Sequence, residues 1–232
     1  MSSNFTDLYD ALNSKFAENF ERWKAAHGDG LEIIELKCRA LGIWRSILEK
    51  EIAETNNDTE ILGVFDEVFS DIVLSIYLSS CGLDNPAQIV LRRSLELGVA
   101  AVYLWDNPIR FYSWQTHDED LHFSEMADAL WSPIYVAYLK SRHHVECHHV
   151  ERQLLDRLYR ELSNTTHGKP ATFESQLSER YTYTKVDALR HFHLVQRVQD
   201  VLLTLWGNRF RNRVTELEAA LPALRAKSRS GH

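Results

Sequence analysis

Residues 86–105 read PAQIVLRRSLELGVAAVYLW, and apolar side chains in this stretch occupy the whole circumference of a helix. A helix with one polar face lies at a surface, whereas a helix that is apolar all round is usually buried at the centre of a protein. Pro86 suits the first turn of a helix, and Asp106-Asn107-Pro108 ends it. The stretch therefore predicts a central helix around which the other elements pack.

Outward from this helix, the rest of the chain also carries helical periods and helix-stopping residues. Apolar residues recur at steps of three and four in residues 5–27, which Gly28 and Gly30 terminate. Further helices are predicted at 31–55, about 58–80, 109–115, 119–130, 133–142, 148–166 and 185–221, the last with a break near Gly207-Asn208. No segment alternates at a period of two. We expect an all-α single-domain bundle of about eight to ten helices over residues 1–232.

Composition supports a globular protein that does not enter a membrane. Hydrophobic residues make up 44% of the 232 residues, which is enough for a sizeable core. No apolar run approaches the roughly 18 residues of a membrane span. The first residues lack the basic-then-apolar layout of a signal peptide, and Cys38, Cys81 and Cys147 show no paired spacing. These features predict a cytoplasmic location and no disulfide framework.

The formal net charge of −7 is unevenly distributed along the chain. Residues 209–232 form a basic C-terminal end, which we expect to be partly flexible, with six basic side chains and two acidic ones. Such an end on an acidic body suits contact with nucleic acid or with an acidic partner. Alternatively, it is a solvated helix end whose cations fit the local dipole.

The segment Tyr159–Gly168, YRELSNTTHG, holds the main candidate for chemistry. On a continuous helix Arg160, Ser163, Asn164 and His167 share one face, and Arg160 and His167 are two turns or about 10.5 Å apart. His167 precedes a helix stop, where the helix dipole favours a protonated imidazole. An arginine beside a histidine suits a phosphate group and proton transfer.

Metal-independent RNA cleavage needs both functions. One group must move a proton at the 2′-hydroxyl or the leaving oxygen, and a cation must stabilise the charged phosphorane. Arg160 and His167 are far apart along one helix, so two copies across a two-fold axis would have to build one composite site. The alternative is structural, with Arg160 paired to Asp156 and His167 capping the helix.

The segment from Arg160 to His167 resembles the R-x(4–6)-H motif of the HEPN superfamily, small helical proteins of which many are dimeric ribonuclease toxins of antiviral and toxin–antitoxin systems. The resemblance implies a homodimer that acts on RNA without a cofactor, with Arg160 and His167 as the catalytic pair. The family favours a small polar residue after the arginine, where this chain has Glu161.

A broader resemblance covers about residues 84–168. Arg92-Arg93-Ser94-Leu95-Glu96, then Tyr103-Leu104-Trp105-Asp106, then Tyr159 with Leu162-Ser163 and His167 are similar to a family of uncharacterised bacterial helical proteins, which often occur among predicted defence genes. This resemblance implies no established activity. The alternative function is therefore a non-enzymatic module that binds a protein or another partner within a defence complex.

Arg92 and Glu96 are ionisable residues on the central helix, and a buried charge without a partner is costly. Their i, i+4 spacing predicts an ion pair. We expect this pair to orient the helix of Tyr159, with Glu96 bonded to Ser163, Asn164 or His167. A salt bridge with no further role is the alternative.

Two remaining patterns are weaker. His144 and His148 are spaced i, i+4, as two zinc ligands on a helix can be, but no second ligand pair stands out, so no metal site is expected. Trp105–Trp114 supplies aromatics near Arg110, for which core packing is the default, and Asp120 belongs to an acidic run suited to a helix N-terminus. The chain has no phosphate-binding or dinucleotide-binding glycine motif and no serine-hydrolase elbow.

Overall fold

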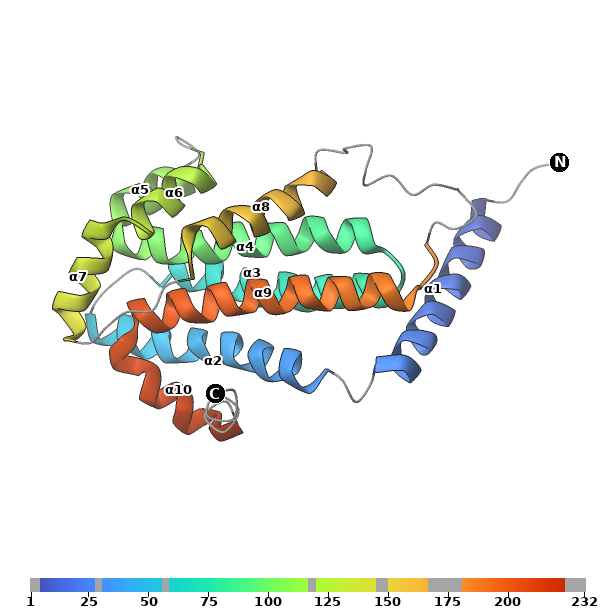
Figure 1. The fold of residues 1–232 in the computed structure, drawn as a ribbon, viewed down its shortest axis with the longest axis horizontal. Coiled ribbons are helices and arrows are strands. Elements are labelled where there is room, and N and C mark those ends of the chain that lie inside the picture. Colours follow the sequence, from blue (N-terminus) through green and yellow to red (C-terminus); the bar gives the residue numbers. More distant parts are fainter. Residues whose placement is uncertain are drawn as a thin grey trace.

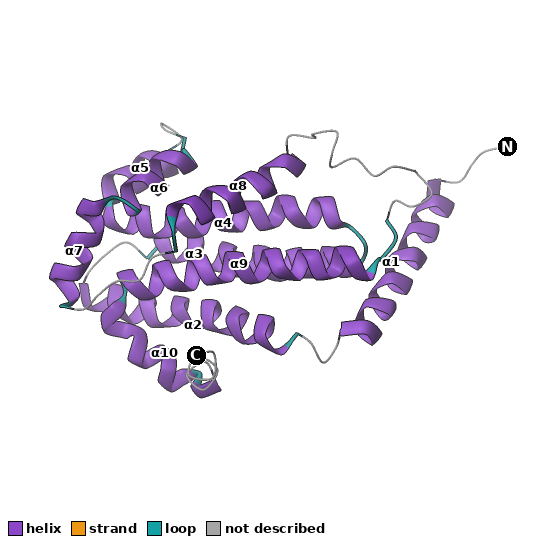
Figure 2. Cartoon of the chain, in the orientation of Figure 1, coloured by secondary structure: helices purple, strands orange, loops and turns teal. Residues whose placement is uncertain are grey.

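The computed structural model describes residues 5–27, 31–55, 59–116, 120–144, 150–166 and 181–223, and these residues form helices and short connections (Figures 1 and 2). The elements in chain order are α1 (Phe5–His27), α2 (Glu32–Thr55), α3 (Ile61–Ser80), α4 (Asp84–Asp106), α5 (Pro108–Gln115), α6 (Phe123–Leu130), α7 (Pro133–His143), α8 (Arg152–Thr166), α9 (Lys185–Arg209), the 3-10 turn η3 (Arg211–Arg213) and α10 (Val214–Ala220). No strand occurs within the described ranges. The predicted all-α bundle is confirmed.

The bundle is elongated, and α2, α3, α4 and α9 run along its long axis (Figure 1). Helix α1 crosses one end, α5, α6 and α7 cover the other, and α8 lies over α4. No helix in the described part of the chain is long and apolar enough to cross a membrane.

Helix α4 lies at the centre, as its apolar circumference predicts. It packs against α3, α5, α6, α8 and α9. It meets α9 at Gly98, whose carbonyl accepts a 3.0 Å hydrogen bond from Trp206 Nε1. A Cβ atom on Gly98 would lie 2.4 Å from Leu202 Cδ2, which is too near for any real contact. Glycine is therefore the residue that lets these two helices meet at this distance.

Helix α9 differs from its prediction at its C-terminal end. It continues through Gly207 and Asn208 to Arg209, and the break falls at Phe210 and η3. The reason is tertiary, because Phe210 is fully buried and its ring lies 5.0 Å from that of Trp105. Burying this side chain turns the chain toward α10, and Gly207 has open space around it and forces no turn.

One asparagine joins three distant segments at the opposite end of the molecule. Asn19 Nδ2 donates to the carbonyls of Cys81 and Tyr181, both at 2.8 Å, and Asn19 Oδ1 accepts from the Tyr183 amide at 3.1 Å. Gly82 lies against it at φ 79°, where a Cβ would be 2.8 Å from Asn19 Nδ2. Helix α1, the α3–α4 turn and the start of α9 are thereby fixed together.

Candidate functional site

A pocket of about 510 Å³ lies beside the centre of α4. Its walls come from α4, α5, the connection before α6, α6 and α8, and its lining residues are Arg92, Arg93, Glu96, Leu97, Ala100, Trp114, Asp120, Leu121, His122, Phe123, Met126 and Tyr159. Of the supporting residues predicted on α4 and α8, Arg92, Glu96 and Tyr159 border this cavity, whereas Ser163 and Asn164 do not line it. Half of the lining residues are apolar or aromatic and half are polar or charged, and a cavity that combines the two kinds of group can hold a small ligand.

Arg92, Glu96 and Tyr159 form one hydrogen-bonded network at the edge of this pocket. Arg92 Nε donates to Glu96 Oε1 at 3.0 Å, and Arg92 Nη2 donates to Tyr159 Oη at 2.9 Å. The Tyr159 hydroxyl in turn donates to Glu96 Oε1 at 3.1 Å. The predicted Arg92–Glu96 ion pair is confirmed, and its link to α8 is Tyr159.

The network keeps the Arg92 guanidinium charged although its side chain is only 15% exposed. Burial alone would lower the pKa of Arg92, but the Glu96 carboxylate and the Tyr159 oxygen outweigh burial and raise it above its ordinary value. The guanidinium also lies 5.1 Å from the centroid of the Tyr159 ring. That ring is stacked parallel to Phe123 with 4.0 Å between centroids, so α4, α6 and α8 meet in one layered contact.

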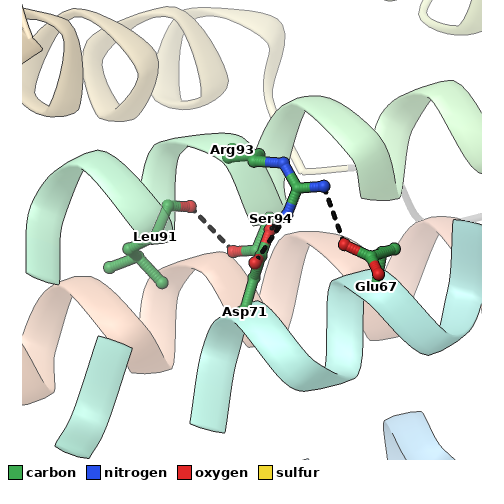
Figure 3. Close-up of polar contacts among 5 residues, drawn as sticks. All are labelled: Glu67, Asp71, Leu91, Arg93 and Ser94. Carbon is green, nitrogen blue, oxygen red and sulfur yellow. Dashed lines mark hydrogen bonds and ion pairs between the residues drawn. The ribbon is translucent and has the colours of Figure 1, made fainter. Parts of the chain in front are cut away.

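Arg93, the next residue on α4, faces α3 (Figure 3). Arg93 Nη1 donates to both oxygens of Asp71, at 2.7 and 2.8 Å, and Arg93 Nη2 lies 2.7 Å from Glu67. Burial raises the pKa of the Asp71 carboxyl, and Arg93 only partly offsets that effect. These contacts join α4 to α3, and the Arg93 guanidinium forms ion pairs with two carboxylates.

Arg160 lies on the outward face of α8 and is exposed. Its Nε donates to the backbone carbonyl of Asp156 at 3.3 Å. The alternative of an Arg160–Asp156 ion pair is wrong, because among the described residues the Asp156 carboxylate forms its ion pair with Arg152, at 3.4 Å. Among the residues that the structure describes, no carboxylate forms an ion pair with Arg160.

The other polar residues of the α8 motif are engaged in packing. Ser163 is buried, and its hydroxyl donates to the Tyr159 carbonyl at 2.7 Å. It does not bond to Glu96, which was one of the predicted contacts; Glu96 accepts a hydrogen bond from the Tyr159 hydroxyl. Asn164 is half-buried on the same helix. Glu161 forms a 2.8 Å ion pair with Arg197 of α9, which directs its carboxylate toward α9.

The second member of the predicted pair, His167, lies outside the described residues, immediately after the end of α8 at Thr166. Helix α8 itself is held in place by its packing against α4. Thr165 donates from its hydroxyl to Gln88 Oε1 at 2.8 Å, and this buried bond holds the last turn of α8 against the first turns of α4.

The histidines considered as metal ligands do not form a described site. His144 is exposed and ends α7 in a left-handed conformation at φ 55°, and His148 lies outside the described residues. Within the described ranges, no group of three or more potential ligands is close enough to hold a metal ion.

The basic C-terminal end is partly structural. Arg209 is buried, and its Nη2 lies 2.6 Å from Asp106 at the end of α4. Arg213 pairs with Glu51 of α2 and with Glu216. These two cations therefore join helices inside the fold, while Arg225, Lys227 and Arg229 lie outside the described residues.

Sequence reasoning missed the far wall of the pocket. Trp114, Asp120, His122, Phe123 and Met126 belong to segments that pattern alone assigns to core packing or to a helix start. Helix α6 begins at Phe123, later than predicted, so Asp120 and His122 lie in an extended connection at the pocket rim. Only the alternation of apolar and polar residues around 120–123 hints at this arrangement.

No protein-family model, curated protein or solved structure matches this chain. Two features of the molecule itself bear on its function. One is Arg160 of α8, which is exposed and has no carboxylate partner among the described residues. The other is a lined pocket on the adjoining side of the same helix.

Proposed function

We propose that the protein is a HEPN-like effector that acts on RNA in phage defence or in a toxin–antitoxin system, as a metal-independent ribonuclease. Arg160 stabilises charge on the phosphate, and His167 transfers the proton. The observation that carries the proposal is the state of Arg160, which is exposed and forms no ion pair with a described carboxylate. A guanidinium in this state is available to a phosphate group.

The contact of Glu161 supports the same proposal. A carboxylate next to the catalytic arginine would repel a phosphate if it pointed into the same space. Glu161 is bonded to Arg197 of α9, which compensates its charge and draws it away from the outward face that carries Arg160. The residue that departs from the family pattern is therefore compatible with phosphate binding at Arg160.

Arg160 and His167 are seven residues apart, a separation of two turns on a continuous helix, so in this proposal the reacting phosphate is held between two copies of the chain. Each copy supplies the arginine of one site and the histidine of the other across a two-fold axis. In the reaction the 2′-oxygen attacks phosphorus, the bond to the 5′-oxygen breaks, and the proton lost by the 2′-hydroxyl is matched by one gained by the leaving 5′-oxygen. The products are a 2′,3′-cyclic phosphate and a 5′-hydroxyl.

The first test measures cleavage of single-stranded RNA by the purified full chain in excess EDTA. We expect Arg160→Ala and His167→Ala to lower the rate by about 100-fold or more, as loss of a transition-state contact does. The matched control is Arg157→Ala. Arg157 is exposed on the same helix and donates from Nε to the Gln153 carbonyl at 3.3 Å, as Arg160 does to Asp156. It should stay within about threefold of the wild type.

Equal rates for wild type, Arg160→Ala and His167→Ala would sink the proposal, as would cleavage of RNA whose 2′-hydroxyls are all replaced by hydrogen. Induced expression gives a second readout, since the wild type should arrest growth and Arg160→Ala should not. RNA binding that survives in all variants without cleavage identifies the non-enzymatic binding module in its place.

A second test concerns the shared site. When Arg160→Ala and His167→Ala chains are mixed and allowed to exchange, half of the dimers are mixed, and one of the two sites in each has both residues intact. Activity should return to about a quarter of the wild-type value if the site spans two copies. No recovery, with mixed dimers shown by mass, places both residues of a site in one chain.

A further inference from the structure

The pocket beside α4 has its cations engaged. Arg92 is bonded to Glu96 and Tyr159 along one wall, and Arg93 is bonded to the two carboxylates of α3. A guanidinium that already donates to carboxylates has little left to offer an anionic ligand. The pocket is therefore poorly suited to a free phosphate or carboxylate, although two arginines line it.

Its acceptors, in contrast, remain available. All three donors that reach Glu96 bind the same oxygen, Oε1, and within the described residues none binds Oε2. Asp120 is exposed at the rim and forms no ion pair with a described side chain. A carboxylate oxygen at the edge of an apolar pocket gains most from a charged hydrogen-bond donor.

The two guanidiniums that line the pocket are compensated by their own carboxylates. Arg92 is bonded to Glu96, and Arg93 is bonded to Asp71 and Glu67 of α3, so Asp120 remains on the pocket wall without a paired cation among the described residues. The whole chain carries −7 at neutral pH. A cleft with excess negative charge and low-dielectric walls concentrates small cations.

The remaining walls are apolar and aromatic. Trp114, Phe123 and Met126 line the cavity together with Leu97 and Ala100 of α4. The faces of aromatic rings attract a cation, and the apolar groups favour an organic body over a hydrated metal ion. A volume of about 510 Å³ is large enough for such a body.

We propose that this pocket binds a small organic cation, an alkylammonium group on an apolar or aromatic body. The ammonium group donates to Asp120 and to Glu96 Oε2, and the body packs against Trp114 and Phe123. Arg92 and Tyr159 hold Glu96 in place for this contact. The proposal concerns a different face of α8 from Arg160 and does not depend on RNA cleavage.

Three probes of similar shape test the charge requirement on the full chain by calorimetry. They are 2-phenylethylamine, the neutral 2-phenylethanol and the anionic 3-phenylpropionate. We expect saturable 1:1 binding of the amine, at least about tenfold tighter than that of the alcohol, because one charge-assisted hydrogen bond is worth about that factor. The anion should not bind measurably. Equal affinity for the three probes, or no saturable binding of the amine, overturns the proposal.

Variants then locate the site. Asp120→Asn is an exposed change that keeps the fold, and it should weaken amine binding by about tenfold, as should Glu96→Gln. The matched control is Asp128→Asn, since Asp128 is an exposed acid of α6 that pairs with Arg152 and does not line the pocket. It should bind the amine as the wild type does. If Asp120→Asn binds as tightly as Asp128→Asn, attraction to the acidic surface explains the binding and the pocket does not.

Discussion

Arg92 and Arg93 are neighbours in the sequence, but the carboxylates that they bind on two sides of α4 differ in how much water reaches them. The Arg93 side faces α3, where the Asp71 side chain is 7% exposed and both of its oxygens are bonded to one guanidinium. The Arg92 side opens on the pocket, where the Glu96 side chain is 33% exposed and one of its oxygens is free of described donors. Adjacent arginines of one helix thus bind a buried carboxylate in a structural ion pair and a partly exposed carboxylate at the edge of a pocket.

The largest expected effect is on stability at low pH, and it tests how far water reaches the buried face of α3. His191 of α9 is 1% exposed, and its Nε2 lies 2.9 Å from Ser75, one turn along α3 from Asp71. The Ser75 hydroxyl donates to the Ala87 carbonyl, so it accepts from Nε2, and Nδ1 has no hydrogen-bond partner in the described part of the chain. Burial lowers the pKa of His191 to about 4, because protonation would place an unpaired N–H in the core.

A histidine whose pKa is lower in the folded protein stabilises the fold above its unfolded pKa of about 6.5, and this contribution is lost as the pH falls toward 4. Over that window the wild type should lose about 3 kcal/mol relative to His191→Gln. Urea unfolding at several pH values measures this difference. His193→Gln, an exposed change two residues away, should follow the wild type, and parallel pH curves for all three proteins would show that His191 is hydrated.

Next in size is the loss of the clamp. Arg93→Ala leaves the buried Asp71 without its guanidinium and should lower the free energy of unfolding by about 2 kcal/mol, less than for a fully buried pair because Arg93 is half exposed. Replacing both residues, Asp71→Leu with Arg93→Met, should be neutral or stabilising, since burial of Asp71 is only partly offset. Thermal and urea unfolding measure both variants. A double variant as unstable as the single one contradicts this account.

A smaller effect is expected on the pocket side. Tyr159→Phe keeps the stack on Phe123 but removes the hydroxyl between Arg92 and Glu96, so stability should fall by about 1 kcal/mol. Arg92 and Glu96 remain bonded to each other, which limits the loss. Tyr112→Phe on the exposed surface is the control in urea unfolding. A loss larger than that of Arg93→Ala would reverse the comparison between the two sides.

The smallest effect is expected on the outward face of α8. Arg160→Ala removes only a bond to a backbone carbonyl, so stability should change by less than about 0.5 kcal/mol. Differential scanning calorimetry measures this change. A stable Arg160→Ala protein ensures that any loss of RNA cleavage reflects the site and not the fold. A marked drop in melting temperature would assign Arg160 a structural part.

The helical architecture was predictable because helix periods and stops are local. Most boundaries agree within a few residues, and the central place of α4 follows from its apolar circumference. The end of α9 was not predictable, because it depends on the burial of Phe210 against Trp105, residues about a hundred positions apart. A glycine in the sequence indicates where a break is possible, and packing decides whether it occurs.

The site was predictable only in part, for a related reason. The Arg92–Glu96 pair follows from spacing along one helix. Its link to Tyr159 and the pocket wall of Trp114 and Asp120 depend on how α5, α6 and α8 pack on α4, which no local pattern encodes. Arg160 could be placed on a helix face from the sequence. The sequence did not show that Asp156 forms its ion pair with Arg152, which leaves Arg160 without a carboxylate partner among the described residues.

The contact of α4 with α9 at Gly98 also bears on which wall of the pocket can move when a ligand binds. The α4 wall packs against α3 on one side and is joined to α9 by the Trp206–Gly98 hydrogen bond on another, so it is held on two sides. The opposite wall is carried by two eight-residue helices, α5 and α6, and by the connection that bears Asp120. We therefore expect a guest of unusual size to shift α5 and α6 and to leave α4 in place.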